Sequence, residues 1–543
     1  MTLGLDKSRS YFLREATGLL REWNTKDAFM YLVLQAAVPM YVSLVYAQGA
    51  WLFGGGSLAL AAIISGIGGT FVGLVYVMLM SMMPRSGGDY VFDSRVLHPA
   101  LGMMFAGGWA VCWQIIWNLI TPGFIASAIL APWFSTLGMI YQSQTLMSLG
   151  SWFSTTTAIV AVMIPLFLVN MLMHLAGLKG YAKFQYFLFG FMCISFGLTF
   201  LLPLAMGPLG WQSRFDSLVY GLTGTKNAYN TTIGAATGYG FQSSAGFSLT
   251  ATLVLMPFIF SSIAGNTWIA ENAGEIKGAN SLKANAKAIL GAVWFCAFII
   301  IATSLAFNYA MGQNFLASLG YLFFQGKPEY VLSQPPYTYF LASLMTTSPI
   351  IISLIFIGLV ANSLNITYNT TLAGSRNLMA MSFDRVFFEK AGHVSDRLHM
   401  PTYSILSMYI IAFLLLPIYL FTGFGTILLG AAAAWMVLLV GASLSALVMP
   451  WKRPDIYRAS PVSKYTIGGI PAMSVVALLA IIFCTSVGVY TLATPTYGLV
   501  NLPSYTFVAV TFLMWIPIYY IFRWYRNKQG IDVDLCFATI PPE

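Results

Sequence analysis

The stretch FIFSSIAGNTWIAENAGEIKG, residues 258–278, begins as an apolar run, changes to small and polar residues, and then places Glu271 and Glu275 one helical turn apart. Such a change needs a physical reason, because glycine and short polar side chains weaken a regular helix. What the change means depends on the solvent around the helix. The interruption comprises Ser261, Ser262, Ile263, Ala264, Gly265 and Asn266.

The composition identifies that solvent as a lipid bilayer. The chain of 543 residues is 58% hydrophobic and only 8% charged, whereas a soluble domain is roughly 25% charged. A helix needs about 20 residues to cross the hydrocarbon core. We therefore predict an all-α polytopic membrane protein with twelve transmembrane helices, near residues 29–52, 58–83, 101–130, 156–174, 184–206, 250–270, 288–312, 346–374, 402–422, 425–449, 469–493 and 505–522.

The positions of lysine and arginine test this count, because these residues are retained on the cytoplasmic side of a membrane. With the chain starting inside and alternating, all 26 except Arg214, Lys226 and Lys327 fall on cytoplasmic segments. We predict a multi-pass plasma membrane protein with both termini cytoplasmic. The formal net charge of +9 then reflects membrane topology, and no clustered basic face with interleaved aromatics indicates nucleic-acid binding.

In a bilayer, irregular backbone persists only where it lines a protein-enclosed polar cavity. The first span has an interruption too, where proline removes a hydrogen-bond donor. Two interruptions five spans apart predict a substrate site between broken helices, although Pro and Gly also produce ordinary kinks. The residues predicted for this first break are Gln35, Ala36, Ala37, Val38, Pro39 and Met40.

Several motifs along the chain resemble those of the amino acid/polyamine/organocation (APC) permeases. Residues 83–102 (MPRSGGDYVFDSRVLHPALG) are similar to the junction of the second and third helices of that family. Residues 174–185 are similar to the junction of its fourth and fifth helices. Residues 265–277 resemble the sixth helix with its closing Glu and Lys. Residues 375–401 and 452–458 resemble the ends of the eighth and tenth helices. The matches occur in the family's order over most of the chain.

The resemblance implies a leucine-transporter-type fold, with a 5+5 inverted repeat followed by two C-terminal helices. It also implies alternating access, in which one bundle moves against a scaffold around a fixed site. Charges and glycines at the junctions would act as gate and hinge contacts, with a purely structural loop as the alternative. These gate and hinge residues are Gly87, Gly88, Asp89, Arg95 and Arg376.

We divide the chain accordingly into repeats, loops and tails. The resulting segments are 1–27 (cytoplasmic N-terminal segment), 28–206 (first repeat, helices one to five), 207–249 (extracellular loop), 250–449 (second repeat, helices six to ten), 450–468 (cytoplasmic loop), 469–526 (helices eleven and twelve) and 527–543 (cytoplasmic tail).

Two groups of residues are candidates for ion coupling. Glu271 is the acid placed nearest the membrane interior, where desolvation favours proton exchange; alternatively it lies solvated at the cytoplasmic rim beside Glu275. The oxygens of Thr367, Asn369 and Thr370 on helix eight suit sodium, although polar residues also link membrane helices. Trp109 on helix three either lines the cavity or packs between helices.

The principal prediction is a secondary transporter of amino acids or related amines, driven by protons or sodium. The first break contains no glycine, whereas the family's glycine amides there hold a substrate carboxylate. This departure leaves open a transporter-like sensor that binds solute without moving it. An enzyme is disfavoured, because no nucleophile and base are placed together in the spans. No metal or cofactor is predicted.

Overall fold

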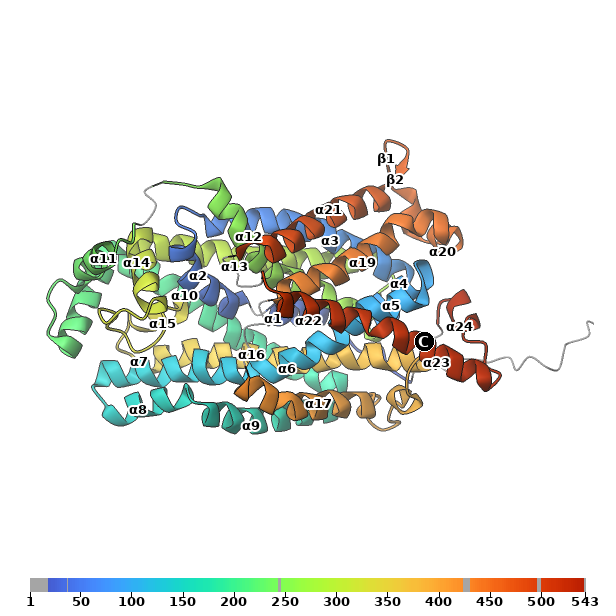
Figure 1. The fold of residues 1–543 in the computed structure, drawn as a ribbon, viewed down its shortest axis with the longest axis horizontal. Coiled ribbons are helices and arrows are strands. Elements are labelled where there is room, and N and C mark those ends of the chain that lie inside the picture. Colours follow the sequence, from blue (N-terminus) through green and yellow to red (C-terminus); the bar gives the residue numbers. More distant parts are fainter. Residues whose placement is uncertain (1–17, 37, 243–245, 423–429, 496–499, 542–543) are drawn as a thin grey trace, which may run out of the picture.

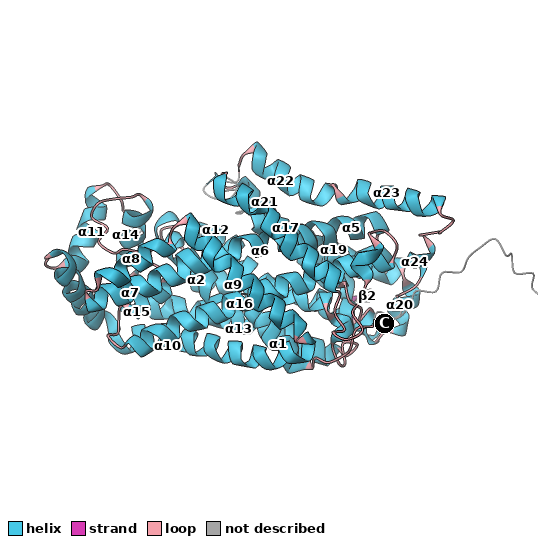
Figure 2. Ribbon diagram, turned by 90° about the horizontal axis from the view of Figure 1, so that it is seen from below, coloured by secondary structure: helices cyan, strands magenta, loops and turns pink. Residues whose placement is uncertain are grey.

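The computed structural model describes residues 18–36, 38–242, 246–422, 430–495 and 500–541. These ranges are almost entirely helical, and most helices run along the longest axis of the molecule (Figures 1 and 2). Eleven helices in the described ranges are long and apolar enough to cross a membrane. The prediction of an all-α polytopic membrane protein is therefore confirmed.

The first repeat predicted from the sequence contains an interrupted first helix and several short or irregular segments. Its elements are α1 (Thr25–Gln35), α2 (Val38–Leu52), α3 (Leu58–Met82), α4 (Gly88–Val96), α5 (Pro99–Ala106), the π-helix η1 (Gly107–Trp113), α6 (Gln114–Gly123), the π-helix η2 (Phe124–Leu130), α7 (Ala131–Tyr141), α8 (Gln144–Phe153), α9 (Thr156–Leu175) and α10 (Gly177–Thr223).

The remainder of the chain repeats the pattern of one interrupted helix followed by long helices. Its elements are α11 (Ala228–Gly238), α12 (Leu249–Ala264), the 3₁₀ helices η3 (Gly265–Glu271) and η4 (Ala273–Glu275), α13 (Leu282–Met311), α14 (Gln313–Phe324), α15 (Thr338–Ser343), α16 (Pro349–Phe383), η5 (Glu389–Gly392), α17 (Thr402–Phe421), α19 (Ala431–Lys452), α20 (Pro454–Ala459), η7 (Pro461–Lys464), the two-stranded pair β1 (Thr466–Ile467) and β2 (Ile470–Pro471), α21 (Ala472–Ala493), α22 (Leu502–Leu513), α23 (Trp515–Lys528) and α24 (Leu535–Ala538).

The predicted extracellular segment 207–249 contains regular structure. Helix α10 continues to Thr223 across a kink at Gly207, whose φ of 66° is available to glycine without steric cost. Helix α11 follows and packs against α14. Pro208 comes directly after this glycine, and the two together account for the kink.

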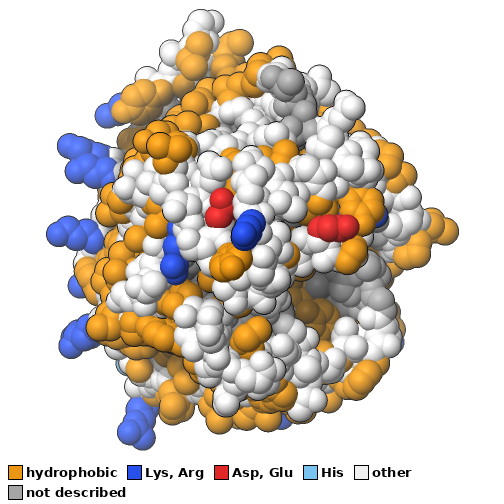
Figure 3. Space-filling model, turned by 90° about the vertical axis from the view of Figure 1, so that its left-hand side faces the viewer, with side chains coloured by type: hydrophobic (Ala, Val, Ile, Leu, Met, Phe, Trp, Pro, Cys, Tyr) orange, Lys and Arg blue, Asp and Glu red, His pale blue; other side chains and the backbone are white. Residues whose placement is uncertain are grey.

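The two ends of the bundle differ in what they contain. In Figure 1, α8, α11 and α14 lie at the left, whereas α4, α20 and α24 lie at the right. Figure 3 looks onto the left-hand end and shows few charged side chains in the middle of that face. We call the right-hand end the α4 end; it carries the segments that the charge pattern predicts to be cytoplasmic.

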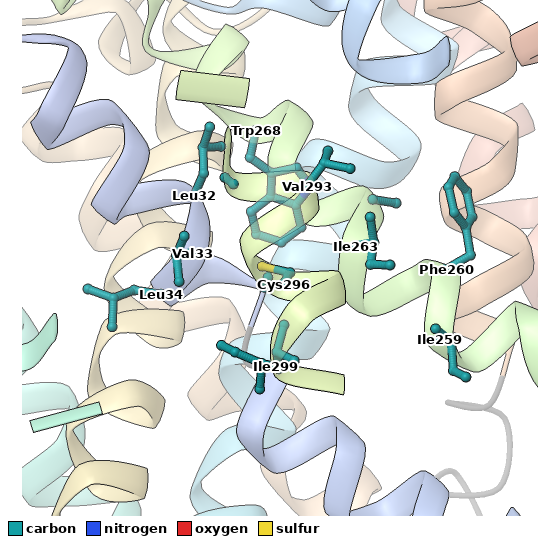
Figure 4. Close-up of a cluster of buried hydrophobic side chains, with 14 of the residues drawn as sticks. Leu32, Val33, Leu34, Ile259, Phe260, Ile263, Trp268, Val293, Cys296 and Ile299 are labelled. Carbon is teal, nitrogen blue, oxygen red and sulfur yellow. The ribbon is translucent and has the colours of Figure 1, made fainter. Parts of the chain in front are cut away.

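Long-range packing places the interrupted helices inside the bundle. Helix α1 packs on α13, α16 and η3, and α12 packs on α2 and α3. Figure 4 shows Leu32 and Val33 of α1 close to Trp268 of η3 and to Val293 and Cys296 of α13. The interrupted segments are therefore neighbours in space, although more than two hundred residues separate them in the sequence.

Candidate functional site

The first interruption lies between α1 and α2. Helix α1 begins with a capping box at Asn24 and ends at Gln35. Ala36 closes its last turn, and the amide nitrogen of Asn362 on α16 donates to the carbonyl of Leu34 at 2.8 Å. Val38 begins α2. Ala37 and the side chains of Pro39 and Met40 lie outside the described residues.

The second interruption begins at Gly265, later than the sequence predicts. Ser261, Ser262, Ile263 and Ala264 are still α-helical. The hydroxyls of Ser261 and Ser262 donate to carbonyls four residues back, so these polar side chains are accommodated within the helix. From Gly265 the chain continues as a 3₁₀ helix. Residues three apart share one face of such a helix, so Gly265, Trp268 and Glu271 are aligned. The side chain of Asn266 lies outside the described residues.

A cluster of four tryptophans adjoins this interruption. The ring of Trp109 on η1 stacks on Trp435 of α19, with centroids 4.8 Å apart, and Trp435 lies 5.3 Å from Trp268. The ring of Trp113 also stacks on that of Trp109, with centroids 5.9 Å apart. A Cβ built on Gly265 would lie 3.2 Å from the Trp435 ring. Trp109 thus packs against the break, together with Trp268 and Trp435, neither of which is among the predicted site residues.

These four indoles are buried, and their N–H groups have no hydrogen-bond partner in the described part of the chain. Buried polar groups are normally hydrogen-bonded, so an unpaired cluster indicates donors available to a ligand or a water. Trp109 and Trp113 also lie in a π-helix, a distortion frequent at functional sites. Trp51, Trp133 and Trp211 lie outside the cluster and also have buried indole N–H groups without a partner among the described residues. The unpaired N–H groups are therefore compatible both with a ligand site and with simple packing.

The predicted sodium ligands on α16 are not brought to one point. Thr370 donates to Asn118 of α6 at 2.6 Å, whereas Asn369 accepts from Tyr181 of α10 at 2.9 Å. Thr367 has a buried hydroxyl without a partner among the described residues. Two of the three oxygen-bearing side chains therefore link α16 to different neighbouring helices, which is the second role that the sequence left open.

Glu271 lies in a buried hydrogen-bonded chain with a residue from the second-to-third helix junction. Its carboxylate accepts from Asn377 at 2.6 Å and is hydrogen-bonded to the carboxyl of Asp89, to which Tyr76 donates at 2.6 Å. Glu271 is 2% exposed and Glu275 is 1% exposed. Both acids are therefore shielded from solvent, in contrast to the solvation that the alternative assumes.

Asp89 precedes the third span, and burial raises the pKa of its carboxyl. A hydrogen bond between two carboxyl groups requires a proton between them, because two carboxylates in contact repel each other. Tyr76 donates to Asp89, and Asn377 donates to Glu271. We call Asp89 and Glu271 the carboxyl pair; the sequence indicated each acid separately but not their contact.

Arg376 and Arg95, both predicted as gate residues, form buried ion pairs. Arg376 contacts Glu275 at 2.6 Å, and Arg95 contacts Asp384 at 2.6 Å. Asp384 also accepts from Tyr90 at 2.8 Å. These pairs join η4 to α16 and α4 to the end of α16, so that the α4 end is held by ionic contacts between distant segments.

Gly87 and Gly88 allow the junction to approach the 3₁₀ segment closely. Gly87 has a φ of 82°, and its N–H donates to the carbonyl of Glu271 at 2.9 Å. A Cβ built on Gly88 would overlap the carbonyl of Ala270. The contact between Asp89 and Glu271 therefore depends on these two glycines.

Substituting alanine at Gly88 is expected to lower the free energy of unfolding by about 2 kcal/mol, because the added methyl group overpacks a buried backbone contact. Thermal unfolding of the detergent-purified protein measures the change. Gly190→Ala is the control, since a Cβ at Gly190 meets nothing within 4 Å. Equal melting temperatures for the two variants would contradict the close approach.

Described residues near both termini contact the α4 end. Trp23 is buried, and its carbonyl accepts from the Lys277 N–H at 2.8 Å. Three arginines hold the C-terminal segment by its carbonyls: Arg95 at Cys536 (3.4 Å), Arg453 at Ala538 (3.3 Å) and Arg85 at Pro541 (2.5 Å). The described conformation is therefore closed by backbone and side-chain contacts at this end.

Comparisons with known proteins agree with this architecture. A family model described as "Amino acid permease" matches residues 32–535 of the chain. The match includes both interruptions, the carboxyl pair and the tryptophan cluster. A search of curated proteins found no match to the chain.

Proposed function

The chain belongs to the amino acid permease family of multi-pass membrane transporters, and from this premise we propose that it moves amino acids or related amines across the plasma membrane by alternating access, coupled to protons. The substrate is held at the interruptions between α1 and α2 and between α12 and η3. The N- and C-termini lie in the cytoplasm, on the side favoured by the basic residues.

The observation that carries proton coupling is the carboxyl pair. Asp89 and Glu271 are buried and hydrogen-bonded to each other. Glu271 is the last residue of the 3₁₀ helix η3, and Gly265, where the interruption starts, is its first residue. Loss of the shared proton would leave two adjacent carboxylates, which repel. The junction and the 3₁₀ segment would then separate, linking proton release to opening at the α4 end.

Sodium is the alternative coupling ion, and two contacts argue against it. A sodium ion between helices one and eight would need free carbonyl and hydroxyl oxygens. The Asn362 amide already donates to the Leu34 carbonyl, and Thr370 is engaged with Asn118. An amide donor thus takes the carbonyl that a cation would otherwise coordinate.

Uptake into proteoliposomes tests the proposal. Purified protein is first screened by thermal shift against amino acids and amines, and a stabilising compound is then offered in labelled form to vesicles with an alkaline lumen. Accumulation is expected to require the pH gradient, to collapse with a protonophore and to be unaffected by sodium. Uptake driven by sodium without a pH gradient would refute proton coupling. Saturable binding without accumulation would refute transport and identify a sensor.

A further inference from the structure

An open groove of about 520 Å³ lies between the first turns of α1 and α13 at the α4 end. We call it the lysine groove, because three of its seven lining residues are lysines and none is acidic. It is lined by Thr25, Lys26, Phe29, Ser281, Lys283, Ala284 and Lys287. None of these residues belongs to the substrate site or to the carboxyl pair.

The charge of the lysine groove is not neutralised within the described residues. Lys26, Lys283 and Lys287 are exposed, and the ion pairs found in the described ranges involve other residues. Asp27, the acid next to Lys26, is buried and accepts from the Asn24 backbone N–H at 2.9 Å. Three cationic side chains from two helices therefore face one opening without an acidic partner.

The groove also has an apolar side that continues along the lipid-facing helices. The ring of Phe29 lies 6.2 Å from Phe189 of α10 and 5.8 Å from Phe295 of α13, and all three rings are half-buried. Lys283 and Lys287 lie in the first turns of a membrane-spanning helix. The opening therefore lies where a lipid headgroup meets its acyl chains. A free phosphate ion would use the lysines but not this apolar surface.

We propose that the lysine groove binds the headgroup of an anionic phospholipid, with the lysines at the phosphate and the acyl chains along Phe29. Basic pockets between membrane helices recognise anionic headgroups in this way. A lipid bound there bridges Lys26 on α1 to Lys283 and Lys287 on α13. It thereby holds the first half of the interrupted helix against its neighbour and favours the closed α4 end; this consequence rests on the proposed transport function.

Lipid binding to the detergent-purified full chain tests the site. The probes are dihexanoyl phosphatidylglycerol, dihexanoyl phosphatidylcholine and glycerol 1-phosphate, with bound molecules counted by native mass spectrometry. Phosphatidylglycerol is expected to bind and to raise the melting temperature, whereas the other two do neither. Equal binding of glycerol 1-phosphate would show a phosphate site and overturn the lipid assignment, as would equal binding of phosphatidylcholine.

A triple variant and a matched control locate the binding. The variant K26Q/K283Q/K287Q is expected to bind phosphatidylglycerol at least tenfold more weakly, because each lysine near an anionic headgroup contributes roughly fivefold. The control K183Q/K452Q/K464Q removes the same charge from exposed lysines outside the groove and is expected to bind normally. Equal affinities in the two triple variants would overturn the proposal.

The failure of this inference is separable from that of the proposed function. The charge-preserving variant K26R/K283R/K287R should retain binding and shows whether the positions tolerate substitution. If phosphatidylglycerol neither bound nor raised the melting temperature while proton-driven uptake was normal, the lipid site alone would be refuted. If no proteoliposome showed uptake, whatever its lipid composition, the transport function would be refuted. The lipid-binding measurements on the detergent-purified protein would still stand.

Discussion

Replacing Glu275 with glutamine is expected to lower the free energy of unfolding by about 3–5 kcal/mol, because it leaves the Arg376 guanidinium buried without its counter-ion. Both side chains are almost fully buried, and the pair has two contacts, at 2.6 and 3.2 Å. Native stabilities are typically about 5–15 kcal/mol. The loss should therefore appear as a large drop in melting temperature and in the monodisperse fraction after purification.

An exposed ion pair provides the control for this prediction. Arg453 and Asp455 are 3.0 Å apart, but the Asp455 side chain is 62% exposed. Such surface pairs contribute about 0–1 kcal/mol, so Asp455→Asn should change the melting temperature little. The double variant E275L/R376M removes both buried charges and should recover much of the loss. Equal effects of Glu275→Gln and Asp455→Asn would contradict the importance of burial.

The hydropathy of the chain was sufficient to predict the spans. It could not predict that the junction between the second and third spans is buried. The sequence places Gly87, Gly88, Asp89 and Arg95 between two spans, as gate contacts of unknown exposure. In the structure α4 is buried along its whole length and packs on α5, α19 and η3. A segment between spans is normally exposed, and its own composition does not reveal what covers it.

The partners of the predicted site residues come from distant parts of the chain. Glu271 contacts Asp89, and Trp109 contacts Trp435. Neither contact follows from helical periodicity, which relates residues a few positions apart. Trp268 was closer to prediction, since it stands three residues after Gly265 in the stretch that breaks the sixth helix. Its alignment with Glu271 follows only once that stretch is known to be a 3₁₀ helix.

The polar residues of the eighth helix show a different limit. Asparagine and threonine oxygens suit both cation binding and hydrogen bonds between helices. The sequence contains the donors and acceptors but not the neighbours that face them. Asn118 and Tyr181, which engage Thr370 and Asn369, lie on two other helices. Only their positions in space favour the interhelical role.

Glu271→Gln is expected to abolish proton-driven accumulation while leaving exchange of substrate across the membrane intact. In the carboxyl pair, Asp89 accepts from Tyr76 and Glu271 accepts from Asn377. The direct contact between the two carboxyl groups needs one titratable proton, because two carboxylates repel each other. A glutamine amide can donate to Asp89 in place of that proton but cannot release it. The closed contact should therefore form, and its dependence on pH should be lost.

The size of this effect follows from the energy in the gradient. One pH unit is worth about 1.4 kcal/mol per proton, which sustains about tenfold accumulation if one proton moves with each substrate. The unsubstituted protein should approach this ratio in proteoliposomes at a gradient of one unit, whereas Glu271→Gln should equilibrate substrate without concentrating it. Counterflow of labelled against unlabelled substrate measures the retained exchange.

Two further variants make the result specific to the carboxyl pair. Asp89→Asn should behave like Glu271→Gln, because either change removes the shared proton. Glu329→Gln is the control: this acid is exposed, accepts from Tyr239 at 2.9 Å and lies far from the pair in sequence. Accumulation by Glu271→Gln equal to that of the Glu329→Gln control would show that the coupled proton binds elsewhere. Loss of exchange as well would show that the buried acid positions the substrate site.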